Sequence, residues 1–300
     1  MAHYLDPKYD LTFKRVFGEH KHLCMSLINS MIPLKEPIVD VEYKTGELIP
    51  DLEILRNTIV DVRCVDGIGR QFIVEMQLFW YEGFKKRVML NASKAYVMQL
   101  DAAEKFAAIH PVYSLNFVNM IFEKSPDMAD VYFHHYKITN IDYPEKRLED
   151  FEFIFIELPK FKPKNRAEKH LHDLWLRFLT EIDENTVELS SDLLENDDIK
   201  EAIDYMERGA YTKEQLESYD KKKIDLMTAS SMLEESEAIG IAIGLEKGEV
   251  IGIEKGKTIN QREVIANGHK AGVSVEIMAM MTGLTQEEVR KIIEELKNKE

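Results

Sequence analysis

Two carboxylates and a glutamine in the first third of the chain have the types and spacing of a hydrolytic metal site. Asp61 lies within Thr-Ile-Val-Asp-Val-Arg-Cys-Val, and Glu75 and Gln77 lie within Phe-Ile-Val-Glu-Met-Gln. A carboxylate in so apolar a segment is costly unless a cation or strong donors stabilise it. A divalent metal removes the repulsion between two close carboxylates, polarises a phosphate and lowers the pKa of a bound water. These residues therefore suit phosphodiester cleavage, in which the Gln77 amide orients water but cannot act as a base.

A β-hairpin must position these side chains. Residues 58–65 are rich in β-branched residues, and residues 70–79 form a second apolar run. Both patterns predict strands, and the Asp-Gly-Ile-Gly sequence between them is typical of a turn. Positions that face each other across a hairpin lie within side-chain reach, so we expect Asp61 to approach Glu75. Side chains alternate along a strand, which places Glu75 and Gln77 on one face.

The remaining pattern predicts an α+β core that is followed by an α-helical extension. A helix is expected over 8–32 and another over 83–106, with further strands over 38–43, 111–122, 130–138 and 151–158 and helices from about 166 onward. Four regions are expected, a core over 1–165, an acidic helical region over 166–235, a glycine-rich segment over 236–270 and a small module over 271–300.

The glycine-rich segment repeats with a period of four residues. Its glycines are Gly240, Gly244, Gly248, Gly252 and Gly256. Residues four apart share one face of a helix, and each glycine costs about 1 kcal/mol of helix propensity. Close approach of a second helix would offset that loss, which predicts a homo-oligomer formed through this segment. A partly disordered linker is the alternative.

The last 30 residues predict two short helices. Ser274 caps the first, Thr282-Gly283 ends it, and Thr285 with Glu288 forms a capping box for the second. Some helix–turn–helix pairs of this length bind DNA, whereas others are packing or protein-contact modules. Four carboxylates on the second helix favour the latter interpretation.

Composition limits the cellular setting and bears on the partner. The net charge of −15 argues against nucleic acid. However, residues 1–125 hold 15 basic and 16 acidic residues, against 24 and 38 in 126–300, so the acidity lies outside the half with the hairpin. No apolar run is long enough to span a membrane, and the N-terminus lacks the features of a signal peptide. We therefore expect a cytoplasmic protein.

Several motifs in order resemble the PD-(D/E)XK nuclease superfamily, and more closely its transposase-like Rpn branch of recombination-promoting nucleases. They are Asp10-Leu-Thr-Phe13-Lys14-Arg-Val-Phe17, Val60-Asp61-Val62, Gly69-Arg70-Gln-Phe-Ile-Val-Glu75-Met-Gln77, Lys86-Arg87, Tyr96-Val-Met-Gln99 and Phe155-Ile-Glu157-Leu158-Pro159-Lys160-Phe161. The glycine repeat and the Thr282-Gly283-Leu284-Thr285 ending also recur in that branch. The resemblance covers most of the chain and implies a restriction-endonuclease-like core of helix, three strands, helix and strand.

The resemblance implies roles for particular residues. Asp61 and Glu75 correspond to the metal ligands, and Gln77 stands where the wider superfamily usually has lysine. Mg²⁺ or Mn²⁺ is the implied cofactor and DNA the implied substrate, cleaved internally in recombination or by mobile elements in bacteria. Asp10, Arg87 and Gln99 are candidate accessory residues. Asp10 is alternatively a helix cap or a partner of the helix dipole.

Three alternatives remain open. Pro50-Asp51 spells the "PD" of the superfamily name, so Asp51 is a rival to Asp61. The basic stretch of Lys160, Lys162, Lys164, Arg166 and Lys169 is either a phosphate-tracking surface or an ordinary surface loop, and His134-His135 is expected to be exposed on a strand. The chain itself is either a Mg²⁺-dependent endodeoxyribonuclease or a catalytically weak nuclease-fold protein that acts as a self-associating interaction module.

Overall fold

The architecture was obtained from a computed structural model of the 300-residue chain. The structure describes residues 4–48, 58–79, 81, 83–100, 105–163 and 170–297. Asp51 and the basic residues Lys164, Arg166 and Lys169 lie outside the described residues. Two compact units are present, one over residues 1–225 and the other over 226–300. The four regions predicted from the sequence stay a prediction, because compactness alone does not test independent folding.

A six-stranded mixed sheet forms the centre of the first unit, in the order β1-β4-β5-β6-β8-β7. Its strands are β1 (Val41–Tyr43), β4 (Val62–Asp66), β5 (Gln71–Gln77), β6 (Val112–Val118), β7 (Phe133–Thr139) and β8 (Arg147–Glu157). The trio β5-β6-β8 is parallel, and the remaining pairs are antiparallel. Two short strands, β2 (Glu47–Leu48) and β3 (Thr58–Ile59), pair separately.

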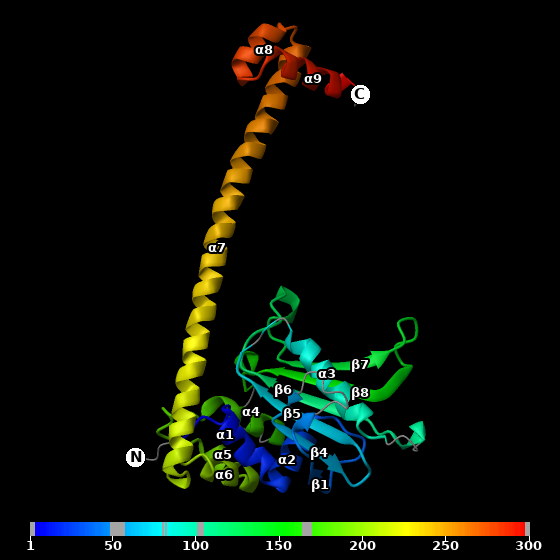
Figure 1. Ribbon diagram of the computed structural model, residues 1–300, viewed down its shortest axis with the longest axis vertical. Coiled ribbons are helices and arrows are strands. Elements are labelled where there is room, and N and C mark those ends of the chain that lie inside the picture. Colours follow the sequence, from blue (N-terminus) through cyan, green and yellow to red (C-terminus); the bar gives the residue numbers. More distant parts are fainter. Residues whose placement is uncertain are drawn as a thin grey trace. The chain divides into compact units, whose positions relative to one another are not determined.

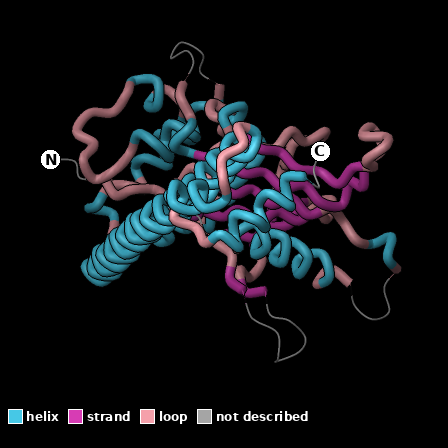
Figure 2. The backbone as a smooth tube through the Cα atoms, turned by 90° about the horizontal axis from the view of Figure 1, so that it is seen from above, coloured by secondary structure: helices cyan, strands magenta, loops and turns pink. Residues whose placement is uncertain are grey.

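Helices cover both faces of this sheet (Figures 1 and 2). The larger group is α1 (Asp10–Phe13), α2 (Lys21–Met31), α4 (Leu171–Glu181), α5 (Ser191–Leu194) and α6 (Asp197–Asp204). It packs against Phe72, Val74 and the other side chains on their face of the sheet. On the opposite face, α3 (Phe84–Val97) packs Ala92 and Ala95 against Ile73. The alternation predicted for residues 70–79 therefore holds, and α3 lies over the face that carries Glu75.

The predicted α+β core with a helical C-terminal extension is confirmed, but the bounds of two helices are corrected. The helix expected over 83–106 ends at Val97. The expected helix over 8–32 is three segments, α1, a π-helical turn η1 (Lys14–Gly18) and α2. His20, the residue before α2, has an extended backbone with φ −118° and ψ 98°. The apolar spacing that predicts one continuous helix arises because all three segments bury their apolar residues against the same core.

The expected hairpin is present, and its turn depends on Gly69. β4 pairs antiparallel with β5, with Val62 opposite Val74 and Cys64 opposite Phe72. Gly69 has φ +91° in the turn, and a Cβ there would collide with the imidazole of His110. Glycine meets both requirements, because it adopts positive φ without strain and permits close approach.

The ends of β7 and β8 correct two predictions about charged residues. His134, expected to be exposed, is buried and lies 2.9 Å from the fully buried Glu157 carboxylate. Lys160, expected on a surface, is buried as well, and its Nζ lies 2.6 Å from the same carboxylate. Lys160 is therefore not part of an exposed basic stretch. The turn η4 (Leu158–Lys160) directs its side chain inward, where Nζ donates to the carbonyls of Glu123 and Met128.

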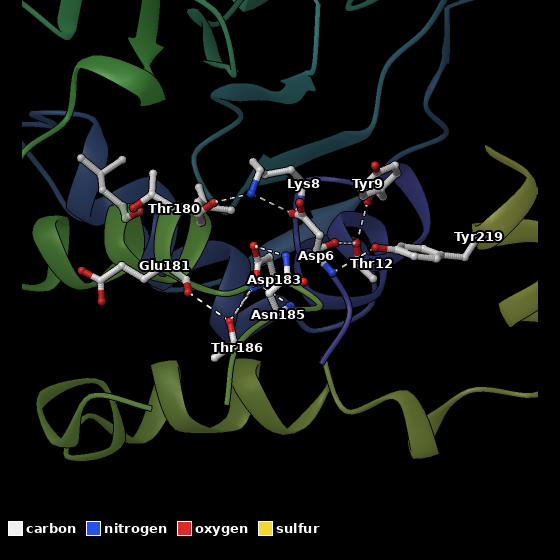
Figure 3. Close-up of polar contacts among 12 residues, drawn as sticks. Asp6, Lys8, Tyr9, Thr12, Thr180, Glu181, Asp183, Asn185, Thr186 and Tyr219 are labelled. Carbon is white, nitrogen blue, oxygen red and sulfur yellow. Dashed lines mark hydrogen bonds and ion pairs between the residues drawn. The ribbon is translucent and has the colours of Figure 1, made fainter. Parts of the chain in front are cut away.

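The beginning of α7 (Lys213–Lys270) belongs to the first unit and is anchored near the N-terminus. Tyr219 is 1% exposed, and its hydroxyl accepts a 3.1 Å hydrogen bond from the Asp6 backbone N–H. Figure 3 shows Tyr219 pointing toward Asp6 and Thr12, whose hydroxyl donates to the Asp6 carbonyl. Lys8 pairs with the Asp6 carboxylate and also donates to the Leu179 carbonyl.

The second unit contains the rest of α7, α8 (Val275–Thr282) and α9 (Gln286–Lys297). The predicted caps are confirmed, with Gly283 at φ +67° and the Glu288 carboxylate accepting from the backbone N–H of Thr285. The glycine-rich segment is helical throughout its repeat. No helix among the described residues combines the length and the apolar character that crossing a membrane requires.

Candidate active site

Asp61 lies where the antiparallel ladder between β4 and β5 ends. Hydrogen-bonded pairs alternate along such a ladder. The next pair would join Met76 to Val60, but the Val60 N–H donates to the Gly46 carbonyl instead. The Met76 N–H then donates to Asp61 Oδ2 at 2.7 Å. Asp61 is therefore in a bend before β4 rather than on a strand, and its carboxylate takes the position of the missing backbone acceptor.

Gly46 permits this arrangement. A Cβ on residue 46 would collide with the carbonyl oxygen of Val60. The close passage of the two backbones lets the chain leave the ladder one residue before Asp61, so the bend that presents the carboxylate depends on a glycine 15 residues earlier in the chain.

Glu75 is the most buried acidic residue at this end of the hairpin. It is 3% exposed in β5, and both of its carboxylate oxygens accept hydrogen bonds from side chains of α3. Asn91 Nδ2 donates to Oε1 at 2.8 Å, and an Arg87 Nη donates to Oε2 at 3.0 Å. Asn91 and Arg87 lie one helical turn apart, so they share the face of α3 that packs on β5.

Gln77 shares the guanidinium with Glu75. The same Arg87 Nη donates to Gln77 Oε1 at 2.8 Å, and Gln77 Nε2 donates to the Phe79 carbonyl. Position 77 therefore carries no positive charge of its own, but the cation of Arg87 is in direct contact with it. Arg87 also lies over the ring of Phe84, 5.1 Å from its centroid.

The accessory candidates divide into two groups. Asp10 lies near Asp61, since its charge acts on the Asp61 carboxyl, and it pairs with Lys14 at 2.6 Å. Gln99 is not brought to the carboxylates. Its amide instead bonds twice to the backbone of His110, each time at 2.9 Å, and joins the chain after α3 to the segment before β6.

Burial raises the pKa of both carboxyls. The pKa of Asp61 is raised to about 7, chiefly by burial; the Met76 N–H opposes the rise, while the charges of Glu75 and Asp10 add to it. Burial also raises the pKa of Glu75, although the positive charge of Arg87 and the hydrogen bond from Asn91 act the other way. Both groups therefore gain from an additional positive charge.

The oxygen atoms gathered here suit a hard divalent cation. Asp61 and Glu75 supply carboxylates, and Mg²⁺ is commonly held by one or two of these together with water and substrate phosphate. Asn91 Oδ1 is buried and has no hydrogen-bond partner among the described residues. Within the same residues, no cluster of three or more His, Cys, Asp or Glu side chains forms a ready metal cage. The fit therefore rests on two carboxylates and neighbouring amide oxygens.

Comparison with known proteins identifies the family. The model of the PD-(D/E)XK nuclease family transposases matches residues 7–236. The chain belongs to this family. The match confirms the resemblance seen in the sequence and covers the sheet, α3 and the beginning of α7. Neither the curated proteins nor the solved structures gave a match to this nuclease-family chain.

Asn91 is the site residue that the motif analysis missed. Its signal is a polar residue within an apolar stripe, because Phe84, Val88 and Ala95 lie on the same side of α3 and are fully buried. A buried amide is costly without hydrogen bonds, so such a residue indicates a specific partner. The partner is Glu75, which a hairpin alone does not reveal.

Proposed function

We propose that this chain is a metal-dependent DNA endonuclease in which Asp61 and Glu75 bind Mg²⁺ or Mn²⁺. The observation that carries the proposal is the burial of Glu75 beside Asp61 at the end of the β4–β5 hairpin, with the pKa of both carboxyls raised. Membership of a nuclease family gives this acidic pair a chemical purpose. The alternative ligand Asp51 precedes the hairpin in the sequence and lies outside the described residues.

Each side chain has a distinct role in the proposal. A bound divalent cation would polarise the scissile phosphate and lower the pKa of a water molecule. Gln77 orients the attacking water through its amide, and Asn91 fixes the rotamer of Glu75. Arg87 is the phosphate contact, since a guanidinium matches the geometry of phosphate oxygens. Asp10 assists as a further acidic group, whereas Gln99 is assigned a structural role by its bonds to His110.

DNA is the proposed substrate despite the acidic composition. The charges of residues 1–125 nearly balance, and the excess of acid lies in residues 126–300. Recombination or mobile-element activity in the bacterial cytoplasm is the proposed setting, as the transposase family suggests. Gln77 in place of lysine predicts slow turnover, because β5 then contributes no positive charge of its own to stabilise the transition state.

Cleavage of supercoiled plasmid DNA tests the proposal. Purified chain with Mg²⁺ or Mn²⁺ is compared with Asp61→Asn and Glu75→Gln, and we expect each variant to lose at least about 100-fold in rate. Asp51→Asn is the matched control, because it removes the rival carboxylate by the same substitution, and it should retain activity. Equal cleavage by wild type, Asp61→Asn and Glu75→Gln would refute the site, and loss in Asp51→Asn alone would transfer it.

A second candidate function is supported by the exposed surface of α7. Each glycine of the four-residue repeat has open space where a Cβ would lie, and Ile241, Leu245 and Ile253 are more than half exposed. We propose that this segment joins copies of the chain into a homo-oligomer. A catalytically weak chain would then act as a self-associating interaction module.

A further inference from the structure

The guanidinium of Arg87 occupies the position of a cation between two proposed site residues. One Nη lies 3.0 Å from Glu75 Oε2 and 2.8 Å from Gln77 Oε1. The Arg87 side chain is 34% exposed, whereas that of Glu75 is 3% exposed. Arg87 thus reaches inward from the rim, and its outer part remains open to solvent.

Arg87 supplies the charge that a buried Glu75 needs. An isolated ionised carboxylate in a protein interior is strongly disfavoured unless it is paired and hydrogen-bonded. Asn91 provides a neutral donor to Oε1, and Arg87 provides the positive charge at Oε2. With both oxygens engaged by α3, part of the cost of burying the Glu75 charge is offset without a metal ion.

A divalent cation bound to Glu75 would meet this guanidinium at close range. Like charges this close repel more strongly at a protein surface than in bulk water, because the effective dielectric is lower there. The repulsion falls if Arg87 turns outward, which its partial exposure allows. A phosphodiester at the rim offers the guanidinium a bidentate anionic partner in exchange.

We propose that Arg87 competes with the divalent cation for Glu75 and Gln77, and that a DNA phosphate relieves the competition by drawing the guanidinium outward. This inference rests on the proposed function. It makes the binding of metal and DNA mutually reinforcing, because the coupling free energy between two sites is reciprocal. The chain alone binds metal weakly, and the site assembles fully only on substrate.

Lys86 provides a matched control for this competition. It precedes Arg87 on α3 and is exposed on the outer side of the helix. Replacement of either residue by methionine removes one positive charge from the same turn of α3. Only Arg87→Met also removes the direct bonds to Glu75 and Gln77.

Binding of Mn²⁺ at pH 8, followed by electron paramagnetic resonance of the free ion, tests the proposal on the full chain. We expect Arg87→Met to bind Mn²⁺ about tenfold more tightly than wild type, equivalent to about 1.4 kcal/mol. Lys86→Met should stay within about threefold of wild type. A phosphorothioate DNA duplex, which resists cleavage, should tighten Mn²⁺ binding to wild type about tenfold and leave Arg87→Met unchanged.

The contrary results are distinct from failure of the proposed function. The competition is overturned if Arg87→Met is folded, as judged by circular dichroism, and binds Mn²⁺ no more tightly than Lys86→Met. It is also overturned if the DNA duplex still tightens Mn²⁺ binding to Arg87→Met. If Arg87→Met fails to fold, Arg87→Gln removes the charge but keeps a polar side chain, and its Mn²⁺ affinity must exceed that of wild type. Glu75→Gln that binds Mn²⁺ as wild type does refutes the metal site itself.

Discussion

Asp61 has unusual acid–base behaviour because its carboxyl is buried, although the Met76 N–H at the end of the β4–β5 ladder acts in the opposite direction. Burial raises the pKa of its carboxyl to about 7, and the nearby charges of Glu75 and Asp10 add to the effect. In the unfolded chain the same group titrates near 4. The folded chain therefore holds a proton on Asp61 over a pH range in which the unfolded chain has lost it.

This difference predicts a pH-dependent stability in the absence of metal. The folded state binds more protons than the unfolded state between about pH 4 and 7, so the free energy of unfolding falls as the pH rises through that window and levels off above it. The contribution of Asp61 to this fall is up to about 4 kcal/mol. We expect Asp61→Asn to be more stable than wild type at pH 5 already, and its advantage over wild type to grow between pH 5 and pH 8.

Urea unfolding at the two pH values measures the effect. The exposed Asp40→Asn variant is the control for loss of a carboxylate elsewhere, and its difference from wild type should not grow between pH 5 and 8. An Asp61→Asn variant that follows wild type at both pH values would show that Asp61 titrates normally in the folded chain.

At the scale of elements, β8 and η4 are held together by a buried ionic network. Glu157 Oε1 accepts hydrogen bonds from the backbone N–H groups of Phe122 and Glu123, and Oε2 lies against His134 and Lys160. The network fixes the loop after β6 to the end of β8. The hydrogen bonds of Glu157 named here do not involve Asp61 or Glu75, so we assign the network a structural role.

Loss of the Glu157 charge should destabilise the fold. Glu157→Gln leaves Lys160 buried without its counter-ion, and removal of one partner of a buried pair costs about 3 to 5 kcal/mol. Glu149→Gln is the matched control, because Glu149 forms a solvent-exposed pair with Lys35, and such a pair contributes at most about 1 kcal/mol. The free energy of unfolding in urea distinguishes them, and equal small losses would contradict the structural role.

The elements differ in how far the sequence predicts them. The β4–β5 hairpin follows from local alternation and a glycine turn, so the sequence alone predicts that Asp61 and Glu75 lie close together. Asn91 and His134 acquire their partners from strands distant in the sequence, and Lys160 donates to the distant carbonyls of Glu123 and Met128, so no local pattern specifies those contacts. The sequence indicates Arg87 as a phosphate contact by its place at the start of the helix and by the family resemblance, whereas its bonds to Glu75 and Gln77 depend on how α3 packs over β5.

At the scale of the whole molecule, the glycine repeat is the feature that a single chain does not explain. A Cβ at Gly244 or Gly248 meets nothing within 4 Å, yet each glycine lowers helix propensity by about 1 kcal/mol relative to alanine. The family match ends at residue 236, before the repeat begins. Self-association through this segment would give the glycines a function.

Light scattering tests the association. Truncation before Gly240 should lower the number of protomers per particle, which is the measured molar mass divided by that of one chain. Gly244→Ala with Gly248→Ala should also lower it, although alanine stabilises the isolated helix by about 1 kcal/mol per position. Gly209→Ala is the control, because Gly209 lies outside α7 and a Cβ there also meets open space. The same number of protomers per particle in all four proteins would exclude the glycine repeat as an oligomer contact.

The guanidinium between Glu75 and Gln77 has a consequence for which residues positions 77 and 87 tolerate together. Because the cation is supplied by α3, position 77 is released from the need to carry a lysine. We expect the two positions to compensate each other, because Gln77→Lys adds a cation and Arg87→Gln removes one. Gln77→Lys combined with Arg87→Gln should therefore keep one cation beside Glu75, whereas either change alone gives two or none.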